Sequence, residues 1–172
     1  MYLKNITGSQ IIYNKLIKNN VKDVFLYTGG AIMSLVDEFH KTNKINYYIN
    51  THEQSSGHAA TGYAKSTGKP GICIMTSGPG VTNSVTALTD ATNDSTPLIL
   101  LTGNVSLNNI GTNAFQECPA TDITKPITKW SYLVDSVCDL SDVIDEAFRV
   151  STSGKPGSVH IDIPKCVLNN KY

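Results

Sequence analysis

The stretch GICIMTSGPG, residues 71–80, decides the fold of this chain. Its first five residues are continuously apolar, which is typical of a strand buried on both faces of a parallel sheet. Gly78 followed by Pro79 suits a helix start, with glycine as the N-cap and proline at the first helical position. The stretch therefore predicts a buried strand over 71–75 that turns tightly into a helix running to about Asn93.

Strand and helix patterns alternate along the rest of the chain. The predicted strands are 24–27, 47–49, 71–75, 98–101, 130–134 and 159–163. The other helices are predicted after a capping box of Thr7 and Gln10, near Ile32, from Glu53 to about Ser66, and from a Ser141 cap to Gly154. This alternation predicts an α/β fold, a three-layer sandwich with a central, mostly parallel six-stranded sheet and helices on both faces.

The composition is that of one soluble globular domain covering residues 1–172. Fourteen basic residues balance fourteen acidic ones, so the net charge favours neither nucleic acid nor an anionic membrane as a partner. No apolar run approaches the roughly 20 residues of a membrane span. The four cysteines form no Cys-x-x-Cys pair and no metal-ligand spacing. We expect free thiols, no bound metal and a cytoplasmic location.

Glycine-rich or polar segments directly follow four of the predicted strands. They are Gly29-Gly30, His52-Glu53, Gly78–Gly80 and Gly103. Because ligands bind beyond the carboxyl ends of parallel strands, we expect these segments to share one rim of the sheet. The chain contains neither Gly-x-Gly-x-x-Gly nor the P-loop pattern, so the Gly78 turn alone does not predict a phosphate site. The polar segment 103–126 is long enough to be functional.

Glu53 has two interpretations. The simpler is a carboxylate at a helix start, stabilised by the helix dipole by about 0.3–1 kcal/mol. The alternative is a functional carboxylate at the rim of the sheet. His52 is interpreted as a positioning or packing residue, because no second metal ligand follows at helical spacing.

Segments spread over nearly the whole chain resemble a known family. They include Tyr27-x-Gly29-Gly30-Ala31, His52-Glu53-Gln54, Thr76-Ser77-Gly78-Pro79-Gly80-x-Thr82-Asn83, Gly111-Thr112-x-Ala114-Phe115-Gln116-Glu117 and Ser153-Gly154-Lys155-Pro156-Gly157. In this order they are similar to the N-terminal, pyrimidine-binding domain of thiamine-diphosphate enzymes, specifically the acetolactate synthase catalytic subunit.

The resemblance implies a role for each matching residue. Glu53 is expected to be catalytic: it would hydrogen-bond N1′ of the aminopyrimidine and favour the imino tautomer, which removes the thiazolium C2 proton. Such positioned acid–base chemistry contributes roughly 10²–10⁴ in rate. The expected cofactor-binding residues are Tyr27, Gly29, Gly30, Pro79, Asn83 and Gln116. The expected substrate contacts are Gly30, Ala31, Phe115 and Gln116.

The resemblance also implies partners. In this family the diphosphate is bound through Mg²⁺ on a C-terminal domain with a Gly-Asp-Gly motif, which these 172 residues lack, and FAD lies on a middle domain. We therefore expect half a thiamine-diphosphate site here, inactive alone, and completed by the diphosphate-binding domain or within a homodimer. The complete enzyme would decarboxylate pyruvate and transfer the two-carbon unit to a small 2-keto acid, in branched-chain amino acid biosynthesis.

Four positions depart from the family pattern, and two other functions stay open. Thr28, Thr51, Asn104 and Asn113 replace proline, arginine, glutamine and aspartate respectively. One alternative is a non-catalytic dimerisation or regulatory module with this fold. The other is a different thiamine-diphosphate-dependent 2-keto acid decarboxylase or carboligase, over which the segment 111–117 favours acetolactate synthase.

Overall fold

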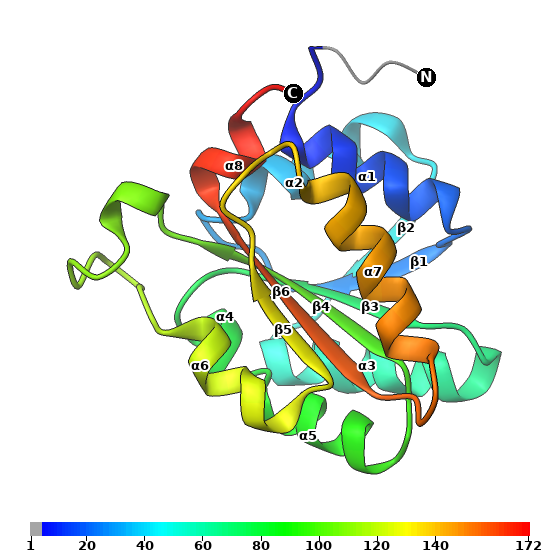
Figure 1. Cartoon of the computed structure of the whole chain (residues 1–172). Helices are drawn as coiled ribbons and strands as arrows, with labels where there is room; N and C mark the ends of the chain where they lie inside the picture. The colour runs from blue at the N-terminus through cyan, green and yellow to red at the C-terminus, as the bar shows by residue number, and fades with distance from the viewer. Residues whose placement is uncertain (1–4) are drawn as a thin grey trace.

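The structure, a computed structural model, describes residues 5–172, so that residues 1–4 of the expected domain lie outside the described residues. The strands are β1 (Asp23–Leu26), β2 (Asn46–Ile49), β3 (Gly71–Met75), β4 (Leu98–Asn104), β5 (Trp130–Leu133) and β6 (Ser158–Pro164). They form one six-stranded sheet in the order β2-β1-β3-β4-β6-β5 (Figure 1). Every pairing is parallel, which confirms the predicted sheet.

Two layers of helices cover the sheet. The helices are α1 (Gly8–Lys18), α2 (Met33–Thr42), α3 (Glu53–Thr67), α4 (Pro79–Thr82), α5 (Val85–Asn93), α6 (Ala120–Thr124), α7 (Leu140–Thr152) and α8 (Lys165–Asn169), with 3₁₀ turns η1 (Leu107–Asn109) and η2 (Lys125–Ile127). In Figure 1, α1, α2, α7 and α8 lie on one face of the sheet, and α3, α4, α5 and α6 lie on the other. The predicted three-layer sandwich is therefore confirmed.

The apolar residues of the strands explain why the sheet is central. Strands β3, β4 and β6 are buried along their whole length, as continuous apolar runs predict. The larger core cluster lies beneath α1, α2 and α7, and a smaller one lies beneath α3 and α5. Strand β2 is an edge strand, and its Tyr48 and Ile49 are exposed.

Local chemistry sets the start of the first helix. The Thr7 side chain accepts a hydrogen bond from the backbone of Gln10, and the Gln10 side chain accepts one from the backbone of Thr7. This reciprocal pair is the predicted capping box.

None of the helices among residues 5–172 has the length and apolarity that crossing a membrane requires.

The helix expected over 79–93 is instead two helices. Asn83 and Ser84 have ψ angles of −12° and −11°, which interrupt the regular helix between α4 and α5. The Ser84 hydroxyl donates to the carbonyl of Gly80 at 2.6 Å, the back-bonding that bends helices at serine. The break turns the side chain of Asn83 away from the helix run and toward the rim of the sheet.

Two other boundaries differ from the prediction. Ser141 does not cap α7, because the chain enters this helix through a turn in which the N–H of Asp139 donates to the carbonyl of Ser136. Gly103 lies within β4 rather than after it, because pairing with β6 continues as far as Asn104. Sequence periodicity also missed α6 and α8, which are each only five residues long.

Two glycines let the loop after β1 lie directly on the ends of the central strands. A Cβ at Gly29 would stand 2.4 Å from the Cβ of Thr76, beyond the end of β3. A Cβ at Gly103 in β4 would stand 2.6 Å from the backbone carbonyl carbon of Ala31. The loop 29–31 therefore packs closely against Thr76 and β4, at distances that leave no room for a side chain at Gly29 or Gly103.

This packing predicts the effect of Gly103→Ala. The added methyl group would meet backbone atoms of Ala31, which cannot move without displacing the loop, so unfolding free energy should fall by about 1–3 kcal/mol. Urea denaturation measures the change. The control is Gly62→Ala on the exposed side of α3, where no atom lies within 4 Å of the new Cβ; helix propensity there should add up to about 1 kcal/mol. Equal stability of the two variants would contradict the packing argument.

Candidate active site

The start of α3 places Glu53 at the carboxyl end of the sheet. His52 is the N-cap of this helix, and its Nδ1 accepts a hydrogen bond from the backbone N–H of Gln54 at 3.1 Å. This confirms a positioning role for His52. Glu53 follows as the first helical residue and is only 6% exposed. The helix-dipole interpretation of Glu53 does not require this burial, and the functional interpretation stays a prediction.

Asn83 holds one oxygen of the Glu53 carboxylate. Its Nδ2 donates to Oε2 of Glu53 at 3.0 Å, across the break between α4 and α5. Within residues 5–172, this is the hydrogen bond that the Glu53 side chain makes, and Oε1 has none. The structure thus brings together two of the residues that the sequence assigned to the cofactor, and it leaves one carboxylate oxygen available to a ligand.

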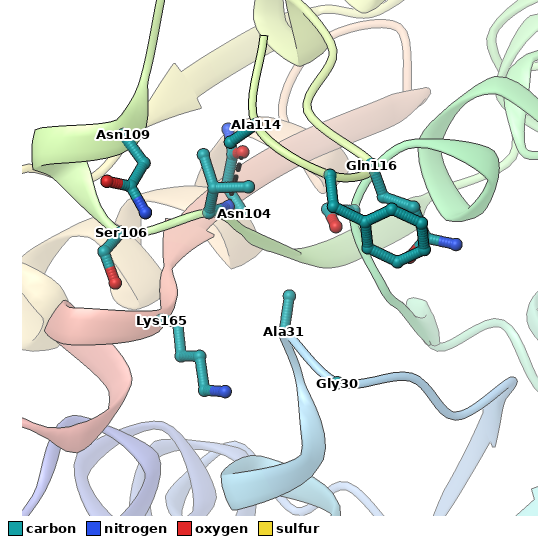
Figure 2. A pocket seen from close by; sticks show the side chains of 11 residues that line it. Gly30, Ala31, Asn104, Ser106, Asn109, Ala114, Gln116 and Lys165 are labelled. Atoms are coloured by element: carbon teal, nitrogen blue, oxygen red, sulfur yellow. Dashed lines mark hydrogen bonds between the residues drawn. The ribbon is translucent and has the colours of Figure 1, made fainter. Parts of the chain in front are cut away.

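A cavity of about 440 Å³ lies beside the loop 29–31 (Figure 2). It is lined by Gly30, Ala31, Ser77, Asn104, Val105, Ser106, Asn109, Ala114, Phe115, Gln116 and Lys165. All four residues predicted to contact substrate are in this lining. Lys165 is the one charged residue of the set, and in Figure 2 its side chain lies below Asn104 and to the left of Ala31.

The segment 111–117 borders this cavity and packs on the turn after β3. Gln116 has a φ of 58° and Gly78 a φ of 56°, both in the left-handed region. A Cβ at Gly78 would stand 2.7 Å from the carbonyl oxygen of Gln116, so the two backbones are in direct contact. Phe115, at 88% exposure, lies almost wholly outside the protein core. Gln116 therefore links the cavity to the turn that starts α4.

The remaining predicted residues surround this arrangement rather than line the cavity. Tyr27 is half-buried and packs against the smaller core cluster, and Pro79 is exposed at the start of α4. Glu53, Asn83, Tyr27 and Pro79 are absent from the cavity lining. The predicted site residues at this edge of the sheet thus include the Glu53–Asn83 pair and the residues that line the cavity.

The chain matches the model of a known protein family. Residues 6–125 match the model described as "Thiamine pyrophosphate enzyme, N-terminal TPP binding domain". The chain belongs to this family.

Similar proteins include several acetolactate synthases. The chain is 46% identical over 162 residues to the mitochondrial acetolactate synthase catalytic subunit of Saccharomyces cerevisiae, covering 94% of this chain and 24% of that protein. It is 45% identical over 169 residues to an acetolactate synthase of Mycobacterium bovis, covering 98% and 27%. It is 48% identical over 158 residues to the chloroplastic acetolactate synthase of Arabidopsis thaliana, covering 92% and 24%. The chain thus spans about a quarter of the length of these relatives.

The residues of this TPP-binding domain fit the pyrimidine end of the cofactor. An aminopyrimidine presents a ring nitrogen and an amino group, which need a proton-sharing acceptor close by. The buried Glu53 carboxylate, with Oε1 lacking a hydrogen bond among the described residues, is such an acceptor. Thr76 adds a buried hydroxyl that has no hydrogen-bond partner in the described part of the chain. In that part, no three His, Cys, Asp or Glu side chains gather as a metal site would require.

A buried polar network behind the cavity was missed by sequence reasoning. Thr102 Oγ1 donates to Asp162 Oδ1 at 2.7 Å and also lies 2.7 Å from Nε2 of His160. Because a hydroxyl has one hydrogen, Thr102 must accept from a protonated Nε2 of His160. Asp162 also accepts from Nδ2 of Asn104, which lines the cavity. The one signal for this network is the pairing of Thr102 with Asp162 across β4 and β6, which only the register reveals.

Burial shifts both ionisable groups of this network toward their neutral forms. It lowers the pKa of His160 to about 3. It raises the pKa of Asp162 to about 6, against hydrogen bonds from Thr102 and Asn104 that lower it. A neutral imidazole in the fold and a histidine of ordinary pKa, about 6.5, in the unfolded chain make stability depend on pH.

We predict that His160→Gln weakens this pH dependence. Below about pH 6.5 the unfolded chain binds a proton at His160 while the fold does not, so acidification favours unfolding. Asp162 acts in the opposite sense, because the fold takes up a proton near pH 6 and the unfolded chain only near pH 4. Between pH 6.5 and 5.0, urea denaturation should show that the wild type loses about 1–2 kcal/mol more unfolding free energy than His160→Gln.

The control for this measurement is His40→Gln, at an exposed position on α2, which should match the wild type. Parallel losses in wild type and His160→Gln would refute the shifted pKa.

Proposed function

We propose that this chain supplies the pyrimidine-binding half of the thiamine-diphosphate site of an acetolactate-synthase-like enzyme. The observation that carries the proposal is the Glu53 carboxylate, which is buried at the carboxyl edge of a parallel sheet and held by Asn83 through only one of its oxygens. Family membership and the acetolactate synthases among the similar proteins support it. The reaction proposed is decarboxylation of pyruvate and transfer of the two-carbon unit to a 2-keto acid.

The chain's own residues would prepare the proton transfer. Asn83 fixes the orientation of the Glu53 carboxylate, so that Oε1 can hold a proton opposite the ring nitrogen of the pyrimidine. The carboxylate is only slightly exposed, and low exposure strengthens a charged hydrogen bond. When bound, thiamine diphosphate supplies the electron sink for decarboxylation. Tyr27, Gly29 and Pro79 are also proposed to contact the cofactor.

The cavity beside the loop 29–31 is proposed to receive the keto acid. Its substrate would carry a carboxylate, and Lys165 is the one cation in the lining. The side-chain amides of Gln116, Asn104 and Asn109 add polar groups that can orient a keto oxygen. Gly30, Ala31 and Phe115 provide the apolar part of the cavity.

We propose that other domains or chains complete the site. The diphosphate, Mg²⁺ and, where used, FAD would be held by segments outside this chain, and a second copy of the chain is proposed to form a homodimer. The length of the relatives, about four times that of the segment they share with this chain, supports the first point. The isolated chain should therefore bind the cofactor weakly or undetectably, and sub-micromolar affinity measured by calorimetry would contradict this.

A hybrid enzyme tests the function. This chain replaces the matching 162-residue segment of the Saccharomyces cerevisiae acetolactate synthase catalytic subunit, and acetolactate formation from pyruvate is measured with thiamine diphosphate and Mg²⁺. We predict activity in the hybrid, and a loss of about 10²–10⁴ in kcat for Glu53→Gln, because glutamine cannot share a proton with the pyrimidine.

The matched control for this hybrid is Glu38→Gln. Glu38 is 9% exposed, almost as buried as Glu53, but lies on α2 across the sheet, so activity should be retained. A folded hybrid that stays inactive on every 2-keto acid would support a non-catalytic module. Activity on 2-keto acids without acetolactate formation would indicate a different decarboxylase or carboligase.

Lys165→Met in the same hybrid tests the substrate end. Methionine keeps most of the side-chain stem but removes the charge that we propose pairs with the substrate carboxylate. KM for pyruvate should rise about tenfold or more, with a smaller change in kcat. Lys155→Met, at an exposed position outside the cavity lining, is the control. An unchanged KM would exclude Lys165 from substrate binding.

A further inference from the structure

Glu117 is an acidic side chain that directly follows Gln116 of the cavity lining. Among the ion pairs of residues 5–172, none involves Glu117. Its carboxylate oxygens instead accept hydrogen bonds from main-chain N–H groups of its own loop. Oε1 accepts from the N–H of Gly111, and Oε2 accepts from the N–H of Ala114 at 3.0 Å. The carboxylate therefore closes the segment 111–117 into a ring.

The backbone of the loop 111–117 adopts a conformation that needs stabilising interactions. Gly111, Asn113 and Gln116 all have positive φ, at 87°, 58° and 58°. Two of these three are not glycine, and such residues occupy the left-handed region at a cost in free energy. A second link, from the N–H of Glu117 to the carbonyl of Ala114 at 2.9 Å, tightens the same turn. The side chain and the backbone of Glu117 thus act together on one short segment.

The segment held in this way carries three residues of the cavity lining, Ala114, Phe115 and Gln116. Phe115 and Gln116 lie between Ala114, which donates to Glu117, and Glu117 itself. The carbonyl of Gln116 packs against Gly78, in the turn that leads into α4 and on to Asn83. A change in the shape of this loop would therefore alter the cavity wall first and the turn beside Glu53 second.

We propose that Glu117 is a positioning residue that sets the shape of the loop 111–117 and so holds Phe115 and Gln116 at the substrate cavity. The proposal of a substrate cavity rests on the function argued above, whereas the hold of Glu117 on the loop is a property of the ligand-free chain. Main-chain hydrogen bonds, that of Gly111 first, lower the pKa of Glu117, which keeps the carboxylate ionised at neutral pH. An ionised carboxylate can serve two N–H donors at once, as this ring requires.

Amide hydrogen exchange of the ligand-free chain tests the hold on the loop. Glu117→Gln keeps the shape of the side chain but replaces one acceptor oxygen by an NH₂ group, which cannot accept from an N–H. We expect exchange at Gly111 and Ala114 to accelerate about five- to tenfold, with no change at Ile74 in β3. Asp122→Asn is the matched control, since Asp122 is an exposed carboxylate on the neighbouring α6. Unchanged protection of Gly111 and Ala114 in Glu117→Gln would overturn the proposal.

The hybrid enzyme described above tests the consequence for substrate. Glu117→Gln should raise KM for pyruvate about tenfold and leave kcat within about threefold of the hybrid carrying the wild-type chain, because Glu53 and Asn83 are untouched. Glu117→Ala should raise KM further, and Asp122→Asn should not raise it. Faster exchange in Glu117→Gln with an unchanged KM would overturn the positioning role. An inactive wild-type hybrid would refute the proposed function, while the exchange experiment would still decide whether Glu117 holds the loop.

Discussion

Parallel pairing of the central strands is the constraint on which the site depends. Because β1, β3, β4 and β6 all run in one direction, the segments that follow them emerge at the same edge of the sheet. The loop 29–31 can cover that edge only because Gly29 and Gly103 leave no side-chain atoms in the way. Glu53 then reaches Asn83 across the edge, although the two residues come from different helices. A single antiparallel strand in the centre would send one of these segments to the opposite end of the molecule.

Residue patterns were enough to predict the sheet and its longer helices, but not α6, α8 or the break between α4 and α5. Continuous apolar runs identify β3, β4 and β6, and Thr7 with Gln10 marks the first helix, because both signals depend on neighbours in the sequence. The contact between Glu53 and Asn83 could not be derived from local patterns, because it arises from the break at Ser84. The network around His160 was missed for a related reason, since Thr102 lies on β4 and its partners lie on β6. Lys165 was missed because its place in the cavity lining depends on the fold of distant segments.

The two groups of residues at the edge are held in place by different interactions. Around Glu53, a single, largely buried carboxylate is oriented by one amide. Around the cavity, a lysine and several amides line a more open space, and backbone conformation decides where they point. Gln116 joins the two through its contact with Gly78, so the geometry of an exposed loop is transmitted to the start of α4. Rigid strands thus place the carboxylate, whereas a short loop shapes the space next to it.

The order of the strands also bears on how quickly the chain reaches its native state. The register pairs Asp23 with Asn46 at the shortest separation along the sequence and Leu98 with Ser158 at the longest. Each pairing therefore closes a long segment of chain before it gains any stabilisation, and no hairpin can nucleate the sheet. Domains dominated by such distant pairings fold in milliseconds to seconds rather than microseconds. Refolding should accordingly be slow, and it should be limited by the step that brings β6 against β4.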